Sequence, residues 1–188
     1  MRAAALALLL LSTAPVLAQA PPAATAAARA VELDRLFAAL AAAPDEVAGA
    51  AVEARIRAAW AQAASPAVVL LMQSGRRNLQ ADADSDAVED FDAALTLQPD
   101  FADAWLLRAA ALSATGDNAA AARDVQQALV LEPRRFDALD LLSRIQEQTG
   151  DHAGALRSLR AALAIHPRLA GGEDRARLLL QKVEGQAT

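Results

Sequence analysis

The sequence predicts an all-α protein built from repeated helical hairpins, and three observations support this prediction. First, 53 Ala and 29 Leu fill much of the 188-residue chain, and both residues have high helix propensity. Second, aromatic residues make up only 3% of the chain and Tyr is absent, although strands favour aromatic and β-branched side chains. Third, prolines recur at a fixed spacing of 34 residues, at Pro99, Pro133 and Pro167.

The composition also excludes several classes of function. Cys is absent, which rules out disulfides, thiolate metal sites, Cys nucleophiles and lipid-modified cysteines. The formal net charge of −5 argues against nucleic-acid binding. The sequence contains neither a Gly-rich phosphate loop nor a nucleophile elbow, so we expect no catalytic residues and no cofactor.

The start of the chain has the three-part layout of a secretory signal peptide. A positively charged beginning precedes an apolar run over residues 3–11, and small residues follow. Cleavage after Ala18 or after Ala20 would leave small residues at the required places, but Pro21 would follow the second bond and generally blocks the peptidase. We therefore expect cleavage between Ala18 and Gln19. Because the apolar run is shorter than a membrane-spanning helix, we expect a periplasmic or secreted protein with no stable membrane insertion after processing.

The 34-residue period extends to apolar positions between the prolines. It recurs at small and at large side chains: Ala87, Ala121 and Ala155, and Phe91, Val125 and Leu159. These positions resemble the pattern of the tetratricopeptide repeat (TPR) family, in which each repeat is a hairpin of two antiparallel helices, A and B. The repeat at 102–135 matches that pattern except that Arg108 replaces the usual Leu at position 7. The resemblance implies a right-handed superhelix of helical hairpins with flanking cap helices.

Turn residues place the helix boundaries inside the repeats. Gly116–Asp117 and Gly150–Asp151 lie between helix A and helix B, where Gly allows a left-handed turn and Asp caps the next helix. Small residues at position 8, namely Gly75, Ala109 and Ser143, let the helix axes approach closely. The expected organisation is a signal peptide at 1–18, a disordered Pro/Ala linker at 19–28, a repeat-like helix pair at 29–66, TPRs at 68–101, 102–135 and 136–169, and a capping helix at 170–184.

The helix pair at 29–66 is in phase with a fourth, diverged repeat. Pro44 and Arg57 break the repeat pattern, so it stays open whether this pair is a true repeat. The order of segments, with a leading pair that ends in Trp60 and Ser65–Pro66, also resembles small exported repeat proteins of alphaproteobacteria. That resemblance implies no established activity.

The TPR resemblance implies a concave groove lined by positions 2, 5, 9 and 12 of each helix A, which share one helical face. In this chain these positions are Val69, Met72, Arg76 and Leu79, then Asp103, Leu106, Ala110 and Ser113, then Asp137, Asp140, Arg144 and Glu147. The groove would be apolar at one end and acidic at the other, so a bound segment should carry a basic residue facing Asp137, Asp140 or Glu147. The Lys and Asn residues that hold a terminal carboxylate in chaperone-binding members are absent, so binding of chaperone tails is not expected.

These observations predict a non-enzymatic, exported scaffold that binds an unidentified protein or extended peptide in the groove, with Met72, Leu79 and Leu106 as apolar anchors. The alternative is a self-associating structural subunit of an envelope assembly, which would form a homo-oligomer through the N-terminal helix pair or the helix at 175–183. Neither hypothesis involves nucleic acid or a metal.

Alternating acids at Asp82, Asp84 and Asp86 are typical of a calcium loop. However, Ala87 and Ala93 stand where an EF-hand needs Gly and Glu. We therefore expect these acids to cap the start of a helix and to oppose the positive end of its dipole.

The histidines and tryptophans are expected to have structural roles. His152 and His166 lie fourteen residues apart without a converging carboxylate, and we expect both on the surface. Trp60 and Trp105 occupy packing positions, and we expect both in the core.

Overall fold

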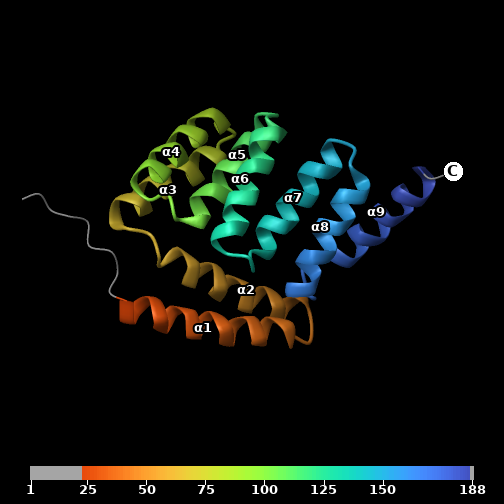
Figure 1. Cartoon of the computed structure of the whole chain (residues 1–188), viewed down its shortest axis with the longest axis horizontal. Helices are drawn as coiled ribbons and strands as arrows, with labels where there is room; N and C mark the ends of the chain where they lie inside the picture. The colour runs from red at the N-terminus through yellow and green to blue at the C-terminus, as the bar shows by residue number, and fades with distance from the viewer. Residues whose placement is uncertain (1–22, 187–188) are drawn as a thin grey trace, which may run out of the picture.

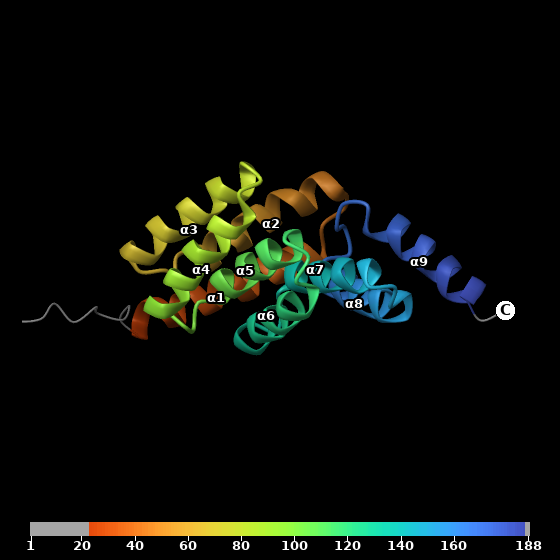
Figure 2. The ribbon, with the colours of Figure 1, turned by 90° about the horizontal axis from the view of Figure 1, so that it is seen from above.

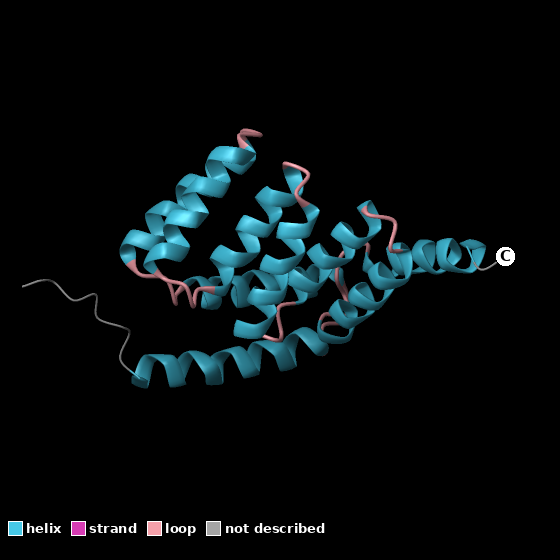
Figure 3. Cartoon of the chain, turned by 45° about the horizontal axis from the view of Figure 1, so that its top comes forward, coloured by secondary structure: helices cyan, strands magenta, loops and turns pink. Residues whose placement is uncertain are grey.

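The computed structural model describes residues 23–186, so the predicted signal peptide and its cleavage site lie outside the described residues. Between these bounds the chain folds into helices joined by short turns, and no strand is present (Figure 3). The predicted all-α class is therefore confirmed. In chain order the helices are α1 (Ala23–Ala41), α2 (Glu46–Ala61), α3 (Pro66–Gln80), α4 (Asp84–Leu97), α5 (Ala102–Ala114), α6 (Asn118–Leu131), α7 (Phe136–Gln148), α8 (His152–Ile165) and α9 (Gly172–Gln186).

Helices α3 to α8 form three hairpins, α3–α4, α5–α6 and α7–α8, which lie in a row in Figures 1 and 2. The turns inside the second and third hairpins hold Gly116 and Gly150 at φ of 91° and 83°, a region that favours glycine. Asp117 and Asp151 follow, and each carboxylate accepts a hydrogen bond from the backbone N–H three residues later, at 3.0 and 2.8 Å. The predicted turn chemistry is confirmed in both hairpins.

The turn of the first hairpin is built differently. Asp82 adopts the left-handed conformation there, with φ of 55°. The N-cap residue Ala83 makes no side-chain hydrogen bond, whereas Asp84 and Asp86 lie in the first turn of α4. Their charges oppose the positive end of the helix dipole. The structure therefore agrees with the prediction that these acids oppose the helix dipole. It does not show the predicted side-chain cap.

Small residues bring the two helices of a hairpin together. A Cβ on Gly75 would lie 2.5 Å from the Phe91 ring, so this buried ring of α4 occupies the space that a side chain on α3 would need. The equivalent residues Ala109 and Ser143 are also fully buried. Close packing of helix B against helix A therefore requires a small side chain at position 8.

Arg108, the departure from the family pattern, joins three helices. Its guanidinium donates to both carboxylate oxygens of Asp124 on α6, at 2.7 and 2.9 Å, and it also binds Asp92 on α4. The hydrogen bond to Asp124 raises the pKa of Arg108 above its ordinary value. The guanidinium carbon also lies 4.7 Å from the centre of the Trp105 ring. Trp105 is only half-buried, so the prediction of a core tryptophan is confirmed for Trp60 and only partly for Trp105.

The N-terminal pair α1–α2 is a hairpin, but it does not stack on the first repeat. Positions 3, 6 and 10 of helix A pack into an apolar cluster with the preceding repeat: Ala104, Leu107 and Ala111 on α5, and Ala138, Leu141 and Ile145 on α7. In α3 the same positions hold Leu70, Gln73 and Arg77, and all three are exposed. A repeat stacked there would bury Gln73 and Arg77 at a cost in desolvation. The pair is therefore not a fourth repeat.

The pair α1–α2 instead crosses the ends of the repeats and packs on the third one. Helix α2 passes the N-terminal ends of the A helices and α1 passes the C-terminal ends of the B helices, forming the lower layer in Figure 1. The Trp60 ring is central, with centroid distances of 6.0 Å to Phe37 of α1 and 5.8 Å to Phe136 of α7. The other buried members of this cluster are Leu33, Leu36, Leu40, Ile56, Ala59 and Ala162.

Polar contacts hold α2 and the turn that follows it against the repeats. The side-chain amide of Gln98 donates to the Ala63 carbonyl at 2.9 Å and accepts from the Ser65 N–H at 3.1 Å. The Nε2 atom of His166 lies 3.2 Å from a carboxylate oxygen of Glu53. Gln98 and His166 occupy the same position of the first and third repeats. The prediction that His166 lies on the surface is wrong, because the N-terminal pair covers it and leaves it 1% exposed.

Both ends of the described chain differ from the predicted boundaries. Helix α1 begins at Ala23, so residues 23–28 are helical where the sequence predicts a disordered linker. Five of these six residues are Ala, which has the highest helix propensity. Helix α9 begins after Gly171 at φ of 65°, packs on α8 and ends two residues later than expected. No helix within 23–186 is long and apolar enough to cross a membrane.

Candidate binding groove

Four of the predicted groove residues come together in one cavity, which we call the α3–α5 cavity. Val69, Met72 and Arg76 of α3 and Asp103 of α5 line this space of about 230 Å³. Its other lining residues are Ala61, Ala64, Gln73 and Phe101. The Arg76 side chain is half exposed, so the cavity combines mostly apolar walls with one accessible cation.

The sequence does not predict the contribution of the N-terminal pair to this cavity. Ala61 ends α2, Ala64 lies in the turn that follows, and the buried Phe101 directly precedes α5. The 34-residue pattern describes contacts between neighbouring repeats, whereas α2 reaches the groove from outside that pattern. The apolar stripe of α2 indicates that this helix covers another surface, but it carries no signal for which one.

Asp103 and Asp137, both predicted to line the groove, are buried in ion pairs with Arg135. Arg135 is 2% exposed; its guanidinium binds Asp103 and both carboxylate oxygens of Asp137, the latter at 3.0 and 3.1 Å. Arg57 of α2 adds a hydrogen bond of 2.9 Å to Asp137, and Arg76 lies 3.5 Å from Asp103. Burial by itself lowers the pKa of Arg135, but the charges of Asp137 and Asp103 outweigh it and raise that pKa above its ordinary value. Asp137 joins α2 to the third repeat, and Asp103 joins the first and second repeats through Arg76 and Arg135.

The acids of the third repeat are also neutralised within the chain. Asp140 accepts hydrogen bonds from Arg144 at 3.0 Å and from Arg175 of α9 at 2.5 Å. Glu147 accepts one from Lys182 of α9 at 2.6 Å. For Asp140 and Glu147, basic groups that the sequence led us to expect on a partner are therefore supplied by α9, while Asp137 pairs with Arg135 and Arg57.

Lys182 also affects the titration of Glu147. The hydrogen bond from Lys182 lowers the pKa of Glu147 below its ordinary value. The stability that this pair contributes is therefore present above the unfolded-state pKa of about 4.3 and is lost as the pH falls through the lower folded-state pKa. We expect Lys182→Gln to cost less than about 1 kcal/mol at pH 7, because the pair is partly exposed, and to cost less still at a pH of about 3. Urea unfolding of both proteins measures this difference, and a difference independent of pH would contradict the assignment.

The remaining predicted anchors do not join the α3–α5 cavity. Leu106 is buried in the apolar cluster between the second and third repeats, where it holds the repeats together. Leu79 is partly buried against the cluster of the first repeat, and Ala110 is half-buried on α5. Within residues 23–186, no group of three or more His, Cys, Asp or Glu side chains is placed to hold a metal ion.

Solved structures with a similar fold include TPR domains and a type III secretion chaperone. The TPR domain of Sgt2 from Aspergillus fumigatus has a TM-score of 0.63 and 22% identity, over 66% of this chain and 83% of that one. The first TPR domain of Spaghetti (RPAP3), bound to the HSP90 peptide SRMEEVD, has a TM-score of 0.61 and 16% identity, over 64% and 95%. The Yersinia enterocolitica type III secretion chaperone SycD, in complex with a peptide of the translocator YopD, has a TM-score of 0.56 and 17% identity, over 65% and 93%. No protein-family model and no curated protein matches the sequence. At these identities the likeness shows that the chain has the TPR fold.

Proposed function

We propose that this protein is an exported, non-enzymatic scaffold that binds a protein or extended peptide in the α3–α5 cavity and the groove around it. The observation that carries the proposal is the cavity itself, in which predicted groove residues from two repeats line one largely apolar space. Peptides bound to RPAP3 and SycD support this use of the fold. The signal-peptide pattern supports export to the periplasm or secretion.

The α3–α5 cavity fits an apolar side chain of an extended segment. Met72 adapts its shape to a bound group because its side chain is flexible and polarizable, and the small Ala61 and Ala64 leave room beside it. Arg76 shares Asp103 with Arg135, so it retains donors for a carbonyl or carboxylate oxygen of the bound segment. We therefore expect a partner segment in which an apolar side chain stands next to an acceptor group.

Selection from a random peptide library tests this proposal. The immobilised protein should enrich peptides that share an apolar residue. Val69→Glu introduces a charge into the cavity wall, and because Val69 is already partly exposed, the variant should still fold. Binding of the selected peptides should fall at least about tenfold, which corresponds to about 1.4 kcal/mol.

Val130→Glu is the matched control for this experiment. Val130 lies on helix B of the second repeat, is 73% exposed and does not line the cavity, so this variant should bind like the wild type. The cavity is rejected if both variants bind equally well, or if selection enriches no common peptide.

The alternative function is self-association as a structural subunit. It is favoured by Leu178 of α9, an apolar side chain that remains 58% exposed at the end of the row of repeats. Among the similar structures, SycD has also been solved as an alternative dimer. Light scattering on the purified protein at tens of micromolar separates the two functions, because a monomer at that concentration rejects self-association.

A further inference from the structure

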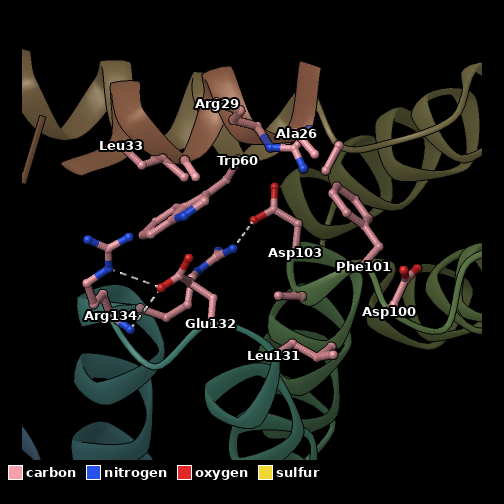
Figure 4. A pocket seen from close by; sticks show the side chains of 14 residues that line it. Ala26, Arg29, Leu33, Trp60, Asp100, Phe101, Asp103, Leu131, Glu132 and Arg134 are labelled. Carbon is pink, nitrogen blue, oxygen red and sulfur yellow. Dashed lines mark hydrogen bonds and ion pairs between the residues drawn. The ribbon is translucent and has the colours of Figure 1, made fainter. Parts of the chain in front are cut away.

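A second cavity, which we call the α1 cavity, lies between the N-terminal pair and the ends of the repeats (Figure 4). Its volume is about 250 Å³, and it shares Phe101 and Asp103 with the α3–α5 cavity. Its walls come from α1, the end of α2 and the two turns that precede α5 and α7. Its apolar lining residues are Leu33, Leu131, Phe101, Trp60, Ala26, Ala30, Ala63 and Ala102.

Most charges of the α1 cavity are already balanced. Two ion pairs account for four of its charged residues: Arg135 with Asp103, and Arg134 with Glu132. The other two, Arg29 and Asp100, have no ion pair within the described residues. Arg29 is half-buried on α1, whereas Asp100 is exposed in the turn before α5. Arg29 is therefore the partly desolvated charge that still lacks a counter-charge.

The position of Arg29 gives the α1 cavity a preference for anions. In Figure 4 its side chain extends from α1 toward Asp103, and Asp100 lies apart from it. Asp103 already forms ion pairs with Arg135 and Arg76, so its single negative charge does not also neutralise Arg29. A carboxylate in the cavity would supply the missing charge and match the planar guanidinium with two oxygens.

Trp60 lines the α1 cavity and carries a buried donor without an acceptor. The side chain is 6% exposed, and its indole Nε1 has no hydrogen-bond partner in the structure. Figure 4 shows the ring between Leu33 and the turn that carries Glu132 and Arg134. The Nε1 atom is itself buried, so a ligand oxygen would reach it only if the ring moved; such a contact would lower the free-energy cost of a buried N–H without an acceptor. Both unused groups are donors, which favours a ligand that offers acceptor oxygens on an apolar body.

We propose that the α1 cavity binds a carboxylate attached to a short aliphatic chain. The carboxylate pairs with Arg29 and offers an acceptor to the Trp60 indole, while the chain contacts Leu33 and Leu131. A free aliphatic acid and the C-terminal residue of an apolar peptide present this same chemistry. The proposal does not rest on the proposed function. The two cavities share Phe101 and Asp103, but Val69→Glu, which tests the α3–α5 cavity, changes a residue that does not line the α1 cavity.

Titration of the ¹⁵N-labelled protein with hexanoate tests the proposal. The chain has two tryptophans, and Trp105 does not line the α1 cavity, so its indole signal is an internal reference. We expect hexanoate to move the Trp60 indole signal and to leave the Trp105 signal in place. Hexan-1-ol and hexylamine, which have the same chain length without a carboxylate, should move neither.

Substitution of arginines on α1 assigns the effect to one side chain. Arg29→Gln should weaken hexanoate binding at least about tenfold. Arg35→Gln is the matched control, because Arg35 is exposed on the same helix, has no ion pair in the structure and does not line the cavity. Equal affinity of Arg29→Gln and the wild type would overturn the proposal, as would an unmoved Trp60 signal or an equal shift with hexylamine.

A short peptide that ends in leucine distinguishes the two sources of the ligand. Tighter binding of the peptide with a free C-terminus than of hexanoate assigns the cavity to a peptide terminus, and weaker binding assigns it to a free acid. In both cases the amidated peptide should bind more weakly than the free one. Equal binding of the amidated and free peptides would overturn the carboxylate assignment.

Discussion

Replacement of Arg135 by methionine is expected to lower the free energy of unfolding by about 3–5 kcal/mol. Arg135 is the cation between two carboxylates that are themselves buried, Asp103 at 6% and Asp137 at 9% exposure. Removal of the cation leaves both charges without their main partner, although Arg76 and Arg57 still reach one each. Methionine keeps most of the aliphatic bulk, so the loss reports the buried charges more than the packing.

The same exchange on the surface is the control for this prediction. Arg144 pairs with Asp140 at 3.0 Å, but its side chain is 60% exposed, so Arg144→Met should cost less than about 1 kcal/mol. Urea unfolding followed by circular dichroism measures both variants. Combining Arg135→Met with Asp103→Asn and Asp137→Asn removes the unpaired charges and should recover part of the loss. An equal loss for Arg135→Met and Arg144→Met would contradict this account of the buried ion pairs.

Trp60→Ala is expected to lower the free energy of unfolding by about 3–5 kcal/mol and to loosen the N-terminal pair. The ring contacts Phe37 within the pair and Phe136 in the third repeat, so it joins two segments that are far apart in sequence. Loss of the ring should expose α2 to trypsin, with the first cuts after Arg55 or Arg57. Urea unfolding gives the stability, and mass spectrometry of a brief digest gives the order of cleavage.

Trp60→Phe is the matched control, because it keeps an aromatic ring in the same place and should lose less than half as much stability as the alanine variant. The outcome that contradicts this prediction is a digest in which Arg157 of the third repeat is cut as early as the two arginines of α2. In that case the Trp60 contact would not be what holds the N-terminal pair in place.

The repeats could be predicted from the sequence because their determinants are local and recur. Gly116 and Asp117 act within a few residues of each other, and the same pair of residue types recurs one period later. Position 8 is small in each repeat, and in the first repeat the ring of Phe91 leaves no space for a larger side chain there. A pattern that acts between neighbours and repeats along the chain can be seen without a structure.

The place of the N-terminal pair could not be predicted, because its contacts occur once and join distant residues. Arg57 reaches Asp137, and Glu53 reaches His166, so no periodic signal connects them. One observation does point in the right direction: Gln73 and Arg77 make the outer face of α3 polar, which disfavours a repeat stacked on it. The polar face of α3 excludes one position for the pair but indicates no other.

The candidate groove was therefore predicted better at its first repeat than at its third. Val69, Met72 and Arg76 meet in the α3–α5 cavity, because the geometry of helix A alone places them on one face. Asp137 and Glu147 lie on the corresponding face, yet they bind Arg135 and Lys182. Arg135, at a repeat position that the pattern does not specify, and Lys182 of α9 thus decide which groove positions stay free for a partner.

A distance between two spin labels tests whether α1–α2 packs on the third repeat. The chain has no Cys, so labels can be placed at Asp34→Cys, which is exposed, and Arg134→Cys, which is half-buried; the two side chains form an ion pair of 2.7 Å. Labels at Glu89→Cys and Arg157→Cys, at the same position of the first and third repeats, provide a reference distance of two repeat lengths. We predict that the distance between labels at residues 34 and 134 is shorter than this reference distance. If the pair stacked on α3 as a fourth repeat, residues 34 and 134 would be separated by about three repeat lengths. A measured distance longer than the reference distance would therefore contradict packing of α1–α2 on the third repeat.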